Sequence, residues 1–171
     1  MTLEIFILFF FRHVWILFIA ITFINELRIR KKARSFILAH PESKVKYHKF
    51  WCTYLILENI PWLIMAIGDI TGMTKYIFDF FFPRLLNPIV LLFHFSVLIL
   101  WGGSIYWVYF KNGAEFLATY PNRFNGGQPN GKRNRIKVLF ALMLIFGIAA
   151  EIFMWTQRVL PPNFHIDNNG S

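Results

Sequence analysis

The chain contains one cysteine, few acidic residues and no extended polar segment. A lone Cys52 excludes an internal disulfide and a metal cluster built on thiolates. Asp and Glu together account for 9 of the 171 residues. The polar stretches between the apolar runs are only loop-sized, so we expect a single domain over residues 1–171.

The motifs that carry common enzymatic chemistry are also missing. The sequence has no His-x-x-x-His, no Gly-x-Ser-x-Gly and no Asp-x-Asp-x-Asp. Ser96 and Ser104 have no obvious base to activate them. We therefore expect neither an enzyme nor a resident metal.

What the chain does contain is apolar residues, 56% of the total, with 21 Phe. A composition this apolar is typical of a protein solvated by lipid. Four runs approach the roughly 20 residues that cross about 30 Å of hydrocarbon. They cover residues 3–25, 50–68, 89–110 and 138–155. The sequence thus predicts an all-α, polytopic membrane protein with a four-helix transmembrane bundle. Because the first run lacks Pro and Gly, we expect it to be a straight helix.

The net charge of +9 is concentrated in two segments. Eight Lys and Arg lie in residues 26–49 and six in residues 111–137, which is fourteen of the 18. Basic loops stay on the cytoplasmic side, so we expect both termini outside, most simply in a bacterial inner (plasma) membrane. The aromatic connection 69–88 and an irregular tail 156–171 would then lie outside. This distribution explains the charge without nucleic-acid binding.

Five ionisable residues fall within the apolar runs. By helical rise, Arg12, His13 and Glu58 lie roughly 13–15 Å from the outer boundary, and His94 and Glu151 roughly 7–9 Å. Buried charges need partners at their own depth. We therefore predict an Arg12–Glu58 ion pair. Arg12 cannot also balance Glu151, so His94, Glu151 and His13 are the candidate titrating or ion-binding groups.

These features favour a small non-enzymatic subunit, oligomeric with itself or within a membrane complex. Its polar interior would support ion or proton conduction, or sensing of a membrane signal. A first alternative is an electron-transfer anchor with haem b or quinone between His13 and His94. A second is a scaffold whose basic segment holds a cytoplasmic partner or anionic lipid headgroups. The contacts in that case would come from Arg28, Arg30, Lys31, Lys32 and Arg34.

Overall fold

The computed structural model describes residues 3–126 and 131–157, and these residues are helical with no strand. The predicted outer tail lies, from residue 158 onward, outside the described residues. The α-helices are α1 (Leu3–Arg12), α2 (Val14–Ala39), α3 (Lys44–Ile70), α4 (Pro88–Phe110), α5 (Gly113–Thr119) and α6 (Arg133–Thr156). Short 3-10 turns join them: η1 (Pro41–Ser43), η2 (Ile77–Phe81), η3 (Pro83–Leu85) and η4 (Arg123–Asn125).

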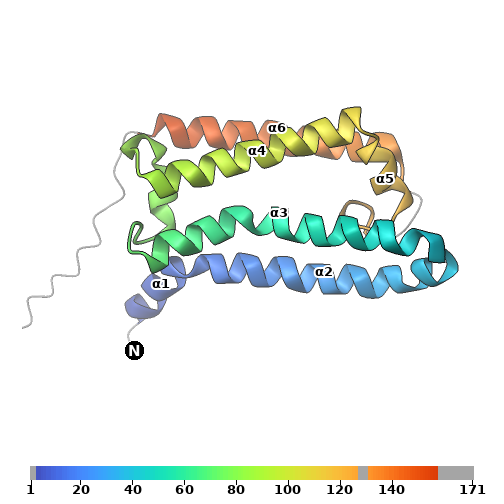
Figure 1. Ribbon diagram of the computed structural model, residues 1–171. Coiled ribbons are helices and arrows are strands. Elements are labelled where there is room, and N and C mark those ends of the chain that lie inside the picture. The colour runs from blue at the N-terminus through green and yellow to red at the C-terminus, as the bar shows by residue number, and fades with distance from the viewer. Residues whose placement is uncertain (1–2, 127–130, 158–171) are drawn as a thin grey trace, which may run out of the picture.

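The four long helices run side by side, and the chain reverses direction between one and the next (Figure 1). Helix α3 packs between α2 and α4, and α6 packs against α4 and α5. Helix α1 and the last turn of α6 lie at the same end of the molecule, to the left in Figure 1. The short helix α5 covers the opposite end.

Within residues 3–126 and 131–157, three helical segments are long and apolar enough to cross a membrane: Pro41–Ile70, Pro88–Phe110 and Arg133–Thr156. They contain the second, third and fourth predicted runs. Only 6% of the most apolar window of the last segment is buried within the chain. Its surface is therefore suited to lipid or to another protein rather than to the interior of this chain.

The first predicted run is not one straight helix, which corrects the expectation from its lack of Pro and Gly. Helix α1 ends at Arg12, and α2 begins at Val14. His13 between them has φ −105° and ψ 22°, outside the α-helical region. The side chains of Arg12, His13 and Trp15 all reach one carboxylate, that of Asp69. This convergence gives the break a physical reason, because a regular helix would direct consecutive side chains apart.

Apolar packing is divided among three clusters rather than one core. One cluster joins α2 to α3 through Ile29, Ala33, Tyr47 and Trp51. A second joins α2, α3, η2 and α4, and a third joins α4, α5 and α6. In the second cluster, Phe80 of η2 is only 3% exposed. The aromatic connection therefore folds onto the helices instead of lying free above them.

The close packing of α5 and α6 against α4 depends on glycine. A Cβ added at Gly147 of α6 would overlap the indole ring of Trp101 on α4. A Cβ at Gly113, the first residue of α5, would lie 2.8 Å from the backbone oxygen of Trp107. In contrast, a Cβ at Gly102 would meet nothing within 4 Å. Glycine is thus required sterically at the first two positions but not at the third.

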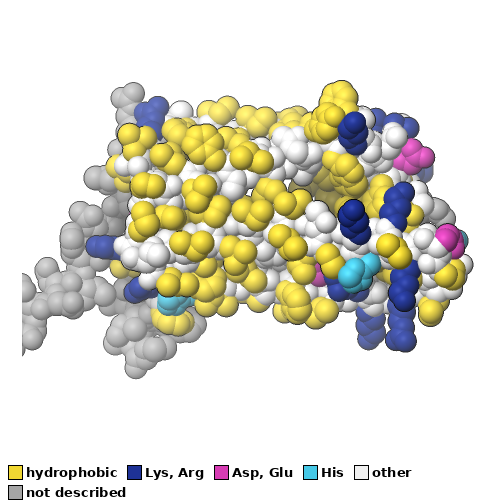
Figure 2. All heavy atoms as spheres, viewed as in Figure 1, with side chains coloured by type: hydrophobic (Ala, Val, Ile, Leu, Met, Phe, Trp, Pro, Cys, Tyr) yellow, Lys and Arg dark blue, Asp and Glu magenta, His cyan; other side chains and the backbone are white. Residues whose placement is uncertain are grey.

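Basic side chains gather at the end of the molecule where α2 turns into α3 and α5 lies, to the right in Figure 2. Hydrophobic side chains cover the length of the helices between the two ends (Figure 2). Much of the segment 26–49 is helical, because α2 continues to Ala39 and α3 begins at Lys44. The basic residues predicted to lie in loops are thus largely carried on the ends of helices.

Candidate functional site

His94 and Glu151 meet in the interior and are the most buried pair of a basic and an acidic side chain in contact among the described residues. The Nδ1 atom of His94 on α4 lies 2.7 Å from Oε2 of Glu151 on α6. Nε2 of His94 lies 2.8 Å from the backbone oxygen of Phe80 in η2. The side chains of His94 and Glu151 are 1% and 8% exposed. One imidazole thus links α4, α6 and the aromatic connection.

The partners of the imidazole fix how many protons the pair holds. A carbonyl oxygen only accepts, so Nε2 must carry a hydrogen and donate it to Phe80. The short contact between Nδ1 and Oε2 then requires one further proton. That proton makes either an imidazolium beside a carboxylate or a neutral imidazole beside a carboxylic acid. In both forms the pair is neutral overall, which suits an apolar interior.

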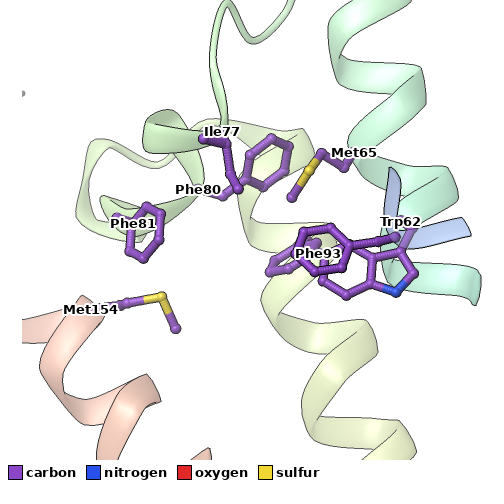
Figure 3. A pocket seen from close by; sticks show the side chains of 8 residues that line it. Trp62, Met65, Ile77, Phe80, Phe81, Phe93 and Met154 are labelled. Carbon is purple, nitrogen blue, oxygen red and sulfur yellow. The ribbon is translucent and has the colours of Figure 1, made fainter. Parts of the chain in front are cut away.

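An apolar cavity of about 210 Å³ lies next to this pair. In Figure 3, Trp62, Met65 and Phe93 lie on one side of it and Met154 lies across from them. The connection between α3 and α4 contributes Ile77, Phe80 and Phe81. The complete lining is Phe18, Trp62, Met65, Ile77, Phe80, Phe81, Phe93 and Met154. No lining side chain carries a charge, so the cavity supplies no polar path to the pair.

Arg12 and His13 have a different partner from the one predicted. Nε of Arg12 donates to Oδ1 of Asp69 at 2.8 Å, and Nδ1 of His13 lies 2.8 Å from Oδ2. Trp15 Nε1 donates to the same Oδ2 at 3.1 Å. Asp69 is 6% exposed and lies in the last turn of α3. This carboxylate therefore joins the α1–α2 break to the end of α3.

The predicted Arg12–Glu58 ion pair is wrong, and helix geometry gives the reason. Glu58 precedes Asp69 by eleven residues on α3, or roughly 16 Å of helical rise. Arg12 and His13 lie at the level of Asp69, so they do not share a layer with Glu58. The prediction failed because Asp69 had been assigned to the outer connection and was not considered as a partner.

Glu58 instead pairs with Arg123 from η4. Nη1 and Nη2 of Arg123 donate to the two carboxylate oxygens at 2.5 and 3.2 Å. This two-point geometry is the strong form of an Arg–carboxylate pair. Burial acts to lower the pKa of Arg123, but nearby Tyr54 and Glu58 outweigh it and raise the pKa above its ordinary value. A residue predicted to lie in a cytoplasmic loop thus reaches back between the helices.

Glu26 is a further interior carboxylate that sequence reasoning missed. It lies on α2 and is 1% exposed, yet it is the first residue after the predicted span and was counted with the basic loop. The available signal was its spacing from Thr22, Ile29 and Ala33, which are all buried on the same helix. Those intervals of three and four residues place Glu26 on the buried face.

Of the two histidines proposed as haem ligands, His94 has no free ring nitrogen. Its two nitrogens have partners, namely Glu151 and the Phe80 carbonyl. His13 is engaged through Nδ1 alone, by Asp69 in the last turn of α3. An iron ligand needs a free nitrogen lone pair, so this arrangement does not favour a haem between them.

The basic residues of the scaffold hypothesis lie on the second half of α2. Arg28, Lys31, Lys32 and Arg34 are exposed, and Arg30 is half-buried. Lys32 Nζ donates to the backbone oxygen of Gly126 at 3.3 Å, which ties α2 to the segment after η4. Most of this set is thus free to contact headgroups or a partner.

Comparison with protein-family models, with curated proteins and with solved structures gives no match. Function is therefore inferred from the side chains and their contacts.

Proposed function

We propose that this chain is a non-enzymatic membrane protein that responds to protons through His94 and Glu151. The observation that supports this is the single proton required between Nδ1 and Oε2 of a pair that is almost fully buried. If that proton is lost, the Nδ1 lone pair faces a carboxylate, and the link between α4 and α6 becomes repulsive. Proton loss would thus weaken the attachment of α6 to α4, while Nε2 of His94 keeps its hydrogen bond to Phe80.

A proton-responsive pair could serve either conduction of ions or protons or sensing of a membrane signal. Conduction needs a continuous polar path, whereas the cavity beside the pair is lined only by apolar side chains. The Glu58–Arg123 pair, in the middle of α3, makes no hydrogen bond to His94 or Glu151 in the described part of the chain. These observations favour sensing, in which the pair changes helix packing without carrying a current.

The topology that we propose has four spans, with α1 and the first half of α2 together forming the first. Both basic segments would face the cytoplasm of a bacterial inner membrane, and both termini would lie outside. The gathering of Lys and Arg at one end of the molecule supports this orientation (Figure 2). The sparse burial of α6 supports assembly with further copies or another subunit. Thiol labelling of Glu42→Cys and, separately, Lys75→Cys in a Cys52→Ala background tests the two sides directly, because both positions are exposed.

Spin labels on α4 and α6 provide the test of sensing. In detergent-solubilised protein, the distance between labels on exposed Leu98 and Ile145 should increase as the pH is raised. Glu151→Gln, in which the amide can hydrogen-bond but cannot ionise, should abolish the change. Glu42→Gln removes an exposed charge and should leave it intact. A distance that is constant with pH in the wild-type protein would refute the sensing proposal.

Proteoliposomes loaded with a pH-sensitive dye test conduction. Sensing predicts no proton flux above that of empty vesicles. Flux that depends on Glu151 would instead establish conduction, and the same Glu42→Gln variant would serve as its control.

A further inference from the structure

A second charged site lies at the basic end of the molecule, around Glu26. Both carboxylate oxygens of Glu26 are buried and have no hydrogen-bond partner in the described part of the chain. Two buried donors, Nε1 of Trp51 on α3 and Nε of Arg123 in η4, likewise lack a partner there. Buried polar groups are nearly always satisfied, so the two unpartnered oxygens of Glu26 indicate that a further group completes this side chain.

The neighbouring charges do not neutralise Glu26. Glu58 from α3, Arg123 from η4 and Arg30 from its own helix act on it electrostatically. The charge of Glu26 also acts on Tyr47 and Tyr54 of α3. The guanidinium of Arg123 is already engaged at two points by Glu58. Arg30 is half-buried and makes no hydrogen bond to Glu26. Glu58, Arg123 and Arg30 are all only partly buried, which leaves Glu26 as the fully buried carboxylate of this group, without a hydrogen-bond partner.

A carboxylate in this position has a large desolvation cost unless a positive charge accompanies it. Glu26 carries one negative charge when ionised, so a single monovalent cation is sufficient to neutralise it. Its two unpartnered carboxylate oxygens are hard ligands of the kind that protons and alkali-metal ions prefer. We propose that Glu26 binds one monovalent cation, either a proton or an alkali-metal ion such as Na⁺. This site is separate from His94–Glu151, and the inference does not rest on the proposed function.

Infrared spectroscopy of the purified full chain, with ¹³C-labelled glutamate, tests this proposal. At neutral pH in choline chloride, the carbonyl band of a protonated carboxylic acid should be present. It should lose the intensity of one carboxyl group per chain in Glu26→Gln. The exposed Glu115→Gln is the matched control and should retain the full band. Glu151→Gln measures any contribution of the His94–Glu151 pair to the carbonyl band. A negative result at Glu26 is therefore not confused with a negative result at that pair.

Replacing choline chloride with NaCl distinguishes the two cations. Loss of the Glu26 band in NaCl would show that Na⁺ displaces the proton, and persistence would identify a proton site. If the band is absent in both salts, NaCl should raise the Tm of the wild-type protein but not that of Glu26→Gln. Absence of both the band and the Na⁺-dependent Tm shift in the wild-type protein would overturn the proposal. Those two wild-type measurements decide it even if Glu26→Gln does not fold.

Discussion

The partner of Glu58 can be determined by a double-mutant cycle, because two arginines make opposite predictions. Glu58→Gln, Arg123→Gln and the double variant form one cycle, and Arg12→Gln replaces Arg123→Gln in the other. Each change keeps a polar side chain of similar length. Each therefore removes a charge without creating a large cavity.

The structure sets the size of the expected coupling. The side chains of Arg123 and Glu58 are 35% and 23% exposed, so the pair is neither at the surface nor fully buried. Exposed pairs contribute about 0.2–1 kcal/mol, and removing one partner of a buried pair costs about 3–5 kcal/mol. We expect a coupling free energy of about 1–2 kcal/mol between Arg123 and Glu58. Arg12 is bound to Asp69 instead, so its cycle with Glu58 should be additive to within about 0.5 kcal/mol.

Unfolding in mixed micelles, followed by circular dichroism as the fraction of denaturing detergent is raised, gives the four free energies of each cycle. A coupling of 1 kcal/mol or more between Arg12 and Glu58, together with additivity at Arg123, would refute the assignment. The same result would place Arg12 and Glu58 together at mid-membrane depth, as the sequence predicts. The same variants report whether η4 is held against the helices, because Arg123 carries that contact.

Two further changes test other contacts in the same assay. Asp69→Asn should lower the free energy of unfolding by about 1–3 kcal/mol, because it weakens an acceptor that three donors share. Arg12→Gln removes one of those donors and should lower it by less. Equal effects of the two variants would contradict the shared acceptor. Gly113→Ala should destabilise by about 1–3 kcal/mol because its Cβ meets the backbone of Trp107. Gly102→Ala, facing open space, should stabilise by up to about 1 kcal/mol, and the same sign for both glycine variants would contradict the packing described.

The helical elements were largely predictable because hydropathy and helix period depend only on local sequence. The predicted run 89–110 differs from α4 by one residue at its start. His94 and Glu151 were predicted at similar depths on different helices, and the structure brings them within hydrogen-bond distance. Depth estimates work here because both residues lie well inside apolar runs.

The remaining polar contacts were not predictable by the same means. Asp69, Arg123 and Glu26 lie at or beyond the ends of apolar runs, where a hydropathy pattern assigns residues to water. Tertiary packing decides otherwise, because η4 folds back onto α3 and the buried face of α2 extends past residue 25. The break at His13 likewise depends on a carboxylate 56 residues away. Local sequence has no information about such a distant partner.

The contact between His94 and Glu151 also has a consequence for synthesis of the protein in the cell. The two residues are 57 positions apart. At about 5–20 residues per second, roughly 3–11 s pass between translation of one and the other. During that interval α4 holds an imidazole whose α6 partner does not yet exist. A chain that ends before Glu151 would leave Nδ1 of His94 without its carboxylate partner.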